Sequence, residues 1–429
     1  MMSLILTVGF IVLMCLRVPV SMAIALSTLP PLLLLDRNLV VLPQFMLEGM
    51  NSAALLAVPF FILAGNLFNA LGLSRRIWDF AQSVVGHLRG GLGHVNVLAN
   101  MIFAGISGSA LADAVALGTI GIPAMEKAGH RRAYATALTL CASVMGPMIP
   151  PSINLLIYGA ITGESIGRLF LAGVIPGVVI GIAMMATVYV LSRTGYDAAP
   201  LLAREKLTVI ARRFTVSAPG LAIPFIVFVG MSFGVLTPTE VGVVCIAYAL
   251  VLGLVYREAS LAAVYKSLVE SARSTVTIMY IIAVSTVAGW IYTYDGVAQA
   301  LAHAMLSLTD NKLLILLMIN VFLIVMGCIL EPIPVLILTV PIFVPVIKML
   351  GVDPIHFGII VNLNITLGII HPPIGIGIYV MMGIVDVKFG ELSRACIPFL
   401  LTLLSCLLLF TYVPEISLWL PNLVMGPQR

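Results

Sequence analysis

Long apolar runs separated by short polar loops dominate the pattern of this chain. A helix needs about 20 consecutive apolar residues to cross the hydrocarbon core of a membrane. Runs of this length cover residues 52–71, 169–192, 216–235, 239–256, 275–294 and 395–413. The pattern therefore predicts an all-α polytopic membrane protein.

Shorter segments complete the predicted layout. Two apolar runs, 3–16 and 18–35, meet at Arg17-Val18-Pro19, and we interpret them as retained membrane segments because no basic start or cleavage site accompanies them. Residues 74–88 and 258–272 alternate polar and apolar positions at helical spacing, which is typical of helices lying in the membrane interface. Each could equally be a connecting surface helix or an arm that joins a fixed scaffold to a moving core.

The residues that interrupt apolar helices repeat at a constant offset of 222 without a gap. The matches pair Gly105 with Gly327, Pro123 with Pro345, Gly129 with Gly351, Gly146 with Gly368, Pro150-Pro151 with Pro372-Pro373, and Pro176 with Pro398. Matching interrupted helices in two halves of a membrane chain point to the binding site of a secondary transporter.

The repeat predicts two halves, each with one re-entrant hairpin and one discontinuous helix. We expect a first inverted repeat over 1–192, a connecting cytoplasmic loop over 193–214 and a second inverted repeat over 215–429. The hairpins are predicted at about 91–128 and 313–350, and the broken helices at about 131–160 and 355–381. The expected architecture is an elevator-type scaffold with a transport domain.

Loop charge predicts the orientation of these segments, because Lys and Arg in short loops mark the cytoplasmic side. Six basic residues flank the first hairpin, whereas two basic and three acidic residues flank the second. The hairpins should therefore open from opposite faces, the first from the cytoplasm. Five basic residues between 193 and 213 agree with a cytoplasmic loop there.

Composition excludes several other classes. The chain is 61% hydrophobic and 9% charged over 429 residues, with a formal net charge of +4, so nucleic-acid binding has no support. The six cysteines stand singly in apolar runs without metal-ligand spacing. Nucleotide-binding and common protease motifs are absent from the sequence.

Small and polar residues in the first half predict an ion site. The hairpin turn is Gly-Ile-Ser-Gly-Ser-Ala-Leu-Ala-Asp at 105–113, and the broken helix carries Gly-Pro-Met-Ile-Pro-Pro-Ser-Ile-Asn at 146–154. Proline removes amide donors, so this helix must unwind and free its carbonyls. Those carbonyls and the hydroxyls suit a hard cation such as Na⁺, while the N-terminus of a half-helix favours an anion. Ordinary close helix packing is the alternative for a small-residue run.

The second half carries polar side chains at the corresponding places. Its hairpin turn contains Glu331, and its broken span contains Asn362, Asn364, Thr366 and His371. Such residues at membrane depth are costly and are functional candidates by default. Glu331 is predicted to bind a cation or to order the tip, and His371 could instead be a hydrogen-bonding core residue.

Four motifs together resemble the large membrane subunit of tripartite ATP-independent periplasmic (TRAP) transporters, of the dicarboxylate type. They are the turn at 105–113, Pro-Pro-Ser at 150–152, Thr-Pro-Thr-Glu at 237–240 and the second Pro-Pro at 372–373. The resemblance covers nearly the whole chain. It implies a Na⁺-driven elevator, a periplasmic substrate-binding protein that delivers the substrate, and a small four-helix membrane subunit as a separate chain. It also implies a multi-pass protein of the bacterial inner membrane.

The resemblance assigns roles by position. The Na⁺ ligands would be Ser107, Gly108, Ser109, Gly146, Pro150 and Ser152 in the first half, and Gly327, Glu331, Thr366, Gly368 and Pro372 in the second. The substrate would meet Ser109, Asp113, Asn154, Asn364 and His371. The sequence departs from common family patterns at Glu331, where Asp is frequent, at His371, where Thr is frequent, and at Gly375-Ile-Gly377, where Asn is frequent.

The sequence thus predicts a permease subunit, not an enzyme, that imports a small organic acid anion with Na⁺. The first alternative is a stand-alone, ion-coupled carboxylate symporter that needs no binding protein. The second is a polytopic membrane enzyme that uses Asp113, Glu331 and His371, which requires these three side chains to converge on one cavity.

Overall fold

The structure is a computed structural model that describes residues 1–35, 40–197, 202–232, 234–309, 311–372 and 375–427. Every regular element in these ranges is helical. The first half contains α1 Met2–Cys15, α2 Val20–Leu34, α3 Val41–Met50, α4 Ala57–Ala70, α5 Leu73–Val85, α6 Leu92–Ser107, α7 Ala110–Lys127, α8 Arg132–Ala142, the 3₁₀ turn Ser143–Met145, α9 Ile153–Thr162 and α10 Ile166–Arg193. The second half contains α11 Leu207–Ser232, α12 Pro238–Val255, α13 Leu261–Tyr294, α14 Val297–Leu308, α15 Lys312–Ile329, α16 Pro332–Met349, α17 Pro354–Ile370, α18 Ile376–Ile384, α19 Phe389–Tyr412 and α20 Glu415–Met425. The predicted all-helical architecture is confirmed.

Seven of the described helices are long and apolar enough to cross a membrane, namely α10, α11, α12, α13, α15, α16 and α19. The number rises to eight if α4 and α5, which are bent by 67° at their junction, count as one span. Large apolar side chains such as Val251 and Leu254 on α12 and Val321 and Val325 on α15 remain exposed on the outside of the bundle. Acyl chains can cover such faces, as expected of a multi-pass membrane protein.

The helix bounds repeat at the same offset as the Gly and Pro residues. Adding 222 to the bounds of α7, 110–127, gives 332–349, which are the bounds of α16. The same addition takes α9, 153–162, to 375–384, beside α18 at 376–384. Each half therefore contains a pair of helices joined by a tight turn, followed by a helix interrupted near its middle.

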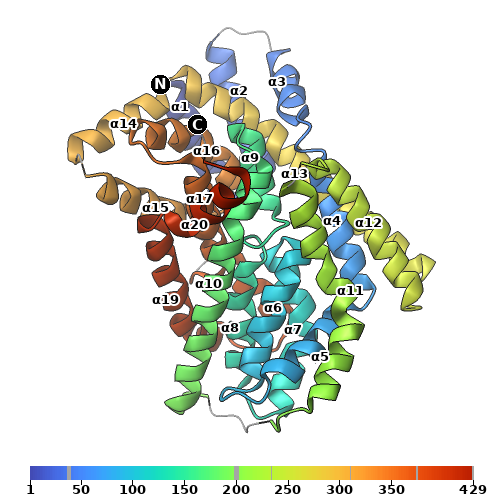
Figure 1. Ribbon diagram of the computed structural model, residues 1–429. Coiled ribbons are helices and arrows are strands. Elements are labelled where there is room, and N and C mark those ends of the chain that lie inside the picture. Colours follow the sequence, from blue (N-terminus) through green and yellow to red (C-terminus); the bar gives the residue numbers. More distant parts are fainter. Residues whose placement is uncertain (36–39, 198–201, 233, 310, 373–374, 428–429) are drawn as a thin grey trace.

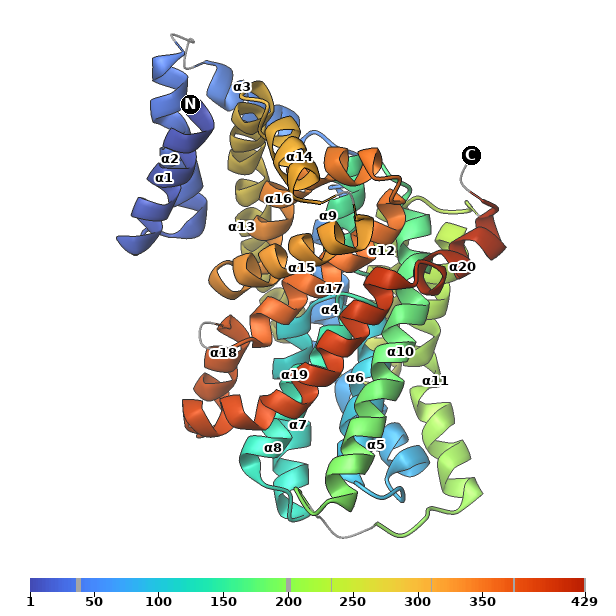
Figure 2. The ribbon, with the colours of Figure 1, turned by 90° about the vertical axis from the view of Figure 1, so that its left-hand side faces the viewer.

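The two helix pairs lie toward opposite ends of the molecule. Figure 1 shows α6 and α7 in the lower part and α15 and α16 in the upper part. α16 packs against α9 and α17, which links the two halves at the centre. α4, α11, α12 and α13 line one side, and α1 and α2 form a separate pair beside α13 (Figure 2).

Some predicted elements differ from the observed ones. Residues 258–272 are no separate interface helix, because α13 runs unbroken for 34 residues through a stretch without proline. The predicted loop 193–214 is shorter than expected, since α11 begins at Leu207, and its residues 198–201 lie outside the described part. Helices α3, α14 and α20 were not predicted. The segment 74–88, by contrast, contains α5 as a distinct helix that begins after Gly72.

Candidate functional site

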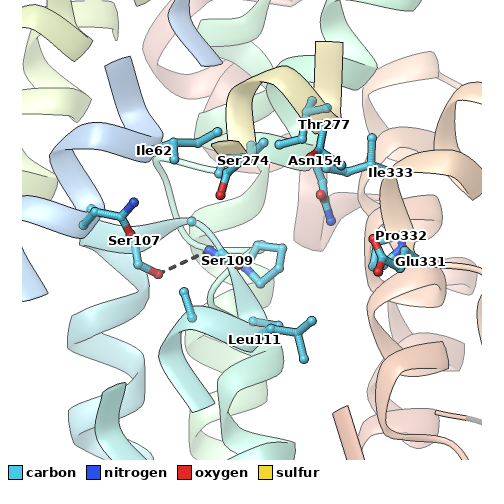
Figure 3. Close-up of a pocket in the computed structure, with 18 of the residues that line it drawn as sticks. Ile62, Ser107, Ser109, Leu111, Asn154, Ser274, Thr277, Glu331, Pro332 and Ile333 are labelled. Carbon is cyan, nitrogen blue, oxygen red and sulfur yellow. Dashed lines mark hydrogen bonds between the residues drawn. The ribbon is translucent and has the colours of Figure 1, made fainter. Parts of the chain in front are cut away.

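A pocket of about 440 Å³ lies where the tips of both helix pairs meet both helix breaks. The first tip contributes residues 107–112 and the second contributes residues 331–333. Pro147 and Asn154 come from the first break, and Ile369 from the second. Figure 3 shows Ser107 and Ser109 on one side of this cavity, Glu331 and Pro332 on another, and Ser274 with Thr277 of α13 between them.

The first tip is built around Gly108. α6 ends at Ser107, Gly108 adopts a left-handed conformation with φ of +67°, and α7 begins at Ala110. A Cβ atom on Gly108 would lie 2.4 Å from the carbonyl oxygen of Pro151. Only glycine permits both the backbone conformation and this close approach. The tip therefore rests directly on the Pro-Pro segment of the first break.

Side chains bond a backbone carbonyl of the first break, where prolines remove amide donors. Regular α-helix ends at Ala142 and resumes at Ile153. Ser152 caps the new helix, accepting a hydrogen bond from the amide of Leu155 at 3.2 Å, and its hydroxyl donates to the carbonyl of Pro147. The amide of Asn362, from α17, also donates to that carbonyl, at 2.6 Å. The break is thus held from both halves.

Asp113 is the one carboxylate enclosed between the first tip and the first break in the described structure. Its side chain is fully buried, and Oδ1 accepts a hydrogen bond from the hydroxyl of Ser107. Oδ2 has no hydrogen-bond partner among the described residues. A Cβ atom on Gly146 would lie 2.4 Å from Oδ2 and 3.1 Å from the carbonyl oxygen of Ser143. The carboxylate therefore lies against the bare backbone of the break and beside the hydroxyl of Ser107, and oxygen ligands of this kind suit a hard cation.

The second tip has a different chemistry. α15 ends at Ile329, and Glu331 stands at the N-cap of α16 with an exposed side chain on the pocket wall. Gly327 of α15 and Gly368 of α17 touch through their backbones, since a Cβ atom on Gly368 would lie 2.2 Å from the carbonyl carbon of Gly327. Here the tip and the broken helix meet through main chain alone.

The second break lies between Ile370 and Ile376. The Nδ1 atom of His371 bonds to the carbonyl of Pro372 at 2.6 Å, while Pro373 lies outside the described residues. Thr366 donates to the carbonyl of Asn362 at 2.7 Å within α17. These contacts show side chains occupied with local backbone rather than directed into the pocket.

The pocket brings together only part of the predicted site. Its lining includes Ser107, Gly108, Ser109, Asn154 and Glu331. Four predicted residues lie behind the first tip and do not line the pocket, namely Gly146, Pro150, Ser152 and Asp113. Asp113 is therefore beside the predicted ion ligands and not on the pocket wall. Four predicted ligands of the second half also do not line the pocket: Gly327 on α15, Thr366 and Gly368 on α17, and Pro372 in the second break.

Two predicted substrate contacts, Asn364 and His371, lie away from this pocket. Asn364 is fully buried on α17, where its amide donates to Asn320 at 2.9 Å and to the carbonyl of Ile360 at 2.8 Å. His371 turns toward the backbone of its own break. Neither side chain lines the pocket, because helix packing and not composition decides which face a polar residue occupies.

The pocket also contains residues that the sequence analysis did not single out. They are Asn66 and Asn69 on α4 and Arg273, Ser274 and Thr277 on α13. Dividing α13 into an interface helix ending at 272 and a span starting at 275 left Arg273 and Ser274 between the two and placed Thr277 at the start of the span. A continuous helical pattern across 267–277 was the signal that could have placed them on one helix.

The enzyme alternative requires Asp113, Glu331 and His371 to meet in one cavity. Asp113 is enclosed behind the first tip, Glu331 faces the pocket, and His371 bonds to Pro372, so the three do not converge on one cavity. Groups of three or more His, Cys, Asp or Glu side chains able to hold a metal ion are also absent from the described residues.

An all-helical bundle with several spans, two broken helices and a central pocket defines a membrane permease of the secondary-transporter kind. Residues 7–416 match the family described as "Tripartite ATP-independent periplasmic transporter, DctM component". The chain belongs to this family and is therefore a transporter permease and not an enzyme, a multi-pass membrane protein of a bacterial TRAP transporter.

Individual relatives agree with this assignment. The sialic acid TRAP transporter large permease protein SiaM of Vibrio cholerae is 40% identical over 89% of this chain and 90% of its own. The C4-dicarboxylate TRAP transporter large permease protein DctM of Pseudomonas aeruginosa is 37% identical over 87% and 88%. The YdaH transporter of Alcanivorax borkumensis, at 15% identity, shares the fold with a TM-score of 0.63 over 89% of each chain.

Proposed function

We propose that this chain is the permease subunit that imports a small organic acid anion, driven by a Na⁺ gradient across the bacterial inner membrane. A periplasmic binding protein would deliver the substrate, and a small four-helix membrane subunit would pack on the scaffold. The name of the family supports the three-part assembly. The names of two relatives, which specify sialic acid and C4-dicarboxylates, support an organic acid as cargo.

The observation that carries the Na⁺ proposal is the buried carboxylate of Asp113. An ionised carboxylate enclosed in protein is strongly unfavourable unless a cation or hydrogen bonds compensate it. Only Oδ1 has a described partner, the hydroxyl of Ser107, and backbone carbonyls of the first break lie nearby. A Na⁺ ion held by Asp113, Ser107 and these carbonyls would supply the missing charge.

We extend the proposal to a second Na⁺ ion at the second break, with a different set of ligands. The carbonyls around the contact of Gly327 with Gly368, the hydroxyl of Thr366 and the chain at Pro372 would provide oxygen atoms there. Glu331, which the sequence analysis included in this set, faces the pocket, and we assign it to the substrate below.

In the mechanism that we propose, α6–α9 and α15–α18 move as one unit against α1–α4 and α11–α13. Contacts between the two halves support a single rigid unit, since Asn154 donates to Asn362 at 3.0 Å and Asn362 donates to the carbonyl of Pro147 at 2.6 Å. Bound Na⁺ would order the first tip, and the ordered tip would complete the pocket. Binding of cation and anion would thereby be coupled.

Reconstitution in proteoliposomes tests the proposed function. The permease, the small subunit and the binding protein loaded with a radiolabelled organic acid should together give uptake that depends on external Na⁺. Replacing external Na⁺ with choline should abolish it. Uptake that persists in choline would contradict Na⁺ coupling, and uptake without the binding protein would favour the stand-alone symporter.

A further inference from the structure

Two charged side chains of opposite sign are found among the described residues that line the pocket. They are Arg273, from the middle of α13, and Glu331, from the second tip. Both side chains are exposed in the structure. The other polar groups around the cavity are neutral amides and hydroxyls. The pocket therefore presents one site for a negative group, one acidic acceptor and a neutral polar wall.

Arg273 has no carboxylate within ion-pair distance among the described residues. Other arginines of the chain differ in this respect, for example Arg76, which pairs with Glu258 at 2.7 Å, and Arg132, which pairs with Glu126. A guanidinium has five donors in a planar fork that matches a carboxylate with two parallel hydrogen bonds. Arg273 is therefore available to bind the carboxylate of a ligand.

Glu331 offers the opposite chemistry. An ionised carboxylate only accepts hydrogen bonds, so it favours hydroxyl groups of a ligand and repels a second carboxylate. Asn154 and Ser109 extend this wall with neutral groups, and Figure 3 shows both at the cavity. The Asn154 amide donates to Asn362 at 3.0 Å, which directs its nitrogen away and leaves its oxygen to accept.

We propose that the pocket selects an organic acid with a single carboxylate and several hydroxyl groups, a sugar acid, over a dicarboxylate. Arg273 binds the carboxylate, and Glu331 accepts hydrogen bonds from hydroxyls at the other end. This inference rests on the proposed function and adds the class of substrate. It also gives α13, outside the proposed moving unit, a direct contact with the cargo.

Binding to the purified permease in detergent with Na⁺ tests the inference. The probes are two sugar acids, D-gluconate and N-acetylneuraminate, the dicarboxylate succinate, and the uncharged polyol sorbitol, each measured by calorimetry. We expect at least one sugar acid to bind, and succinate and sorbitol to bind at least tenfold more weakly. Arg273→Gln should weaken binding of that acid about ten- to hundredfold, the loss expected for hydrogen bonds to a charged group. Arg273→Lys, which keeps the charge but not the fork, should recover part of it.

Matched variants separate this role from a structural one. Lys266→Gln removes a positive charge from an exposed position two turns earlier on α13, where Lys266 pairs with Glu270, and should leave binding unchanged. Glu331→Gln removes the repulsion, so succinate should bind more tightly relative to the sugar acid than in the parent protein. Thermal unfolding of each variant should match the parent within the error, because both pocket residues are exposed.

Three results would overturn the inference: succinate bound more tightly than both sugar acids, binding of neither sugar acid, or an affinity unchanged by Arg273→Gln. These results are distinct from a failure of the proposed function. If the reconstituted assembly takes up succinate with Na⁺ in preference to both sugar acids, the permease function holds and the sugar-acid assignment is wrong. If no organic acid is taken up in any combination of subunits, the proposed function itself is wrong.

Discussion

The two hairpin tips of this permease share a backbone design but not a chemistry. At the offset of 222, Ser107 corresponds to Ile329, Ser109 to Glu331, and Asp113 to Val335. Asp113 and Val335 are both fully buried at the same turn of corresponding helices, so one tip encloses a carboxylate where the other encloses an apolar side chain. Glycine and proline thus determine where the chain breaks, while the neighbouring side chains determine what each break can bind.

The broken helices differ in the same way. A Cβ atom on Gly146 would meet the movable end of the Asp113 side chain, at 2.4 Å from Oδ2. A Cβ atom on Gly368 would meet the main chain of Gly327, at 2.2 Å from its carbonyl carbon. The first contact is one between a backbone and a carboxylate side chain, whereas the second is one between two backbones. Equivalent substitutions should therefore have unequal consequences.

The largest effect that we expect is on stability, from Gly368→Ala. A methyl group that overlaps main chain forces two packed helices apart, so the free energy of unfolding should fall by about 3 kcal/mol or more. Gly146→Ala should cost about 1 kcal/mol, since the Asp113 carboxylate can turn away. Thermal unfolding in detergent measures both.

Gly289→Ala is the control for both substitutions, because a Cβ atom at this position would meet open space. Its free energy of unfolding should stay within about 0.5 kcal/mol of the parent. Equal losses at positions 146 and 368 would contradict the comparison.

The next largest effect should appear in Na⁺ dependence, from Asp113→Asn. The amide keeps the shape but removes the charge that the proposal assigns to the cation. A loss of about 1.5–3 kcal/mol should raise the half-saturating Na⁺ concentration of uptake ten- to hundredfold.

Two variants serve as controls for Asp113→Asn in the same proteoliposome titration. Glu126→Gln removes a half-buried carboxylate from the far end of α7, where Glu126 pairs with Arg132. Val335→Thr changes the corresponding position of the second tip. Both should respond to Na⁺ like the parent. An unchanged response in Asp113→Asn would show that the buried carboxylate has no part in ion binding.

The contrast between the tips also explains what the sequence could and could not predict. Breaks at Gly108, at 146–152 and after Ile370 were predictable, because prolines and left-handed glycines are local constraints on the backbone. The surroundings of single side chains were less predictable: Glu331 lines the pocket and Asp113 is fully buried, and burial depends on how the tip packs against another helix.

The pocket contribution of α13 was missed for a related reason. Arg273 lies between a segment interpreted as an interface helix and one interpreted as a span, and only the continuous helix brings it to the centre. Asn364, by contrast, was predicted to contact substrate but completes a buried chain of hydrogen bonds through Asn320 to Thr411. Composition finds polar residues in apolar helices but does not say which way they face.

The smallest effect concerns the caps of the two breaks. Ser152 caps α9 and also holds the carbonyl of Pro147, whereas Gly375 begins α18 without a side-chain cap. Ser152→Ala should therefore lower the free energy of unfolding by about 1 kcal/mol, as expected for a lost N-cap. Ser165→Ala, which removes the cap of α10 away from the pocket, is the matched control and should cost a similar amount. Because Pro147 lines the pocket, only Ser152→Ala should also weaken substrate binding. If both variants lose stability and neither loses affinity, the cap supports the helix alone, and the first break is no more specialised for binding than the second.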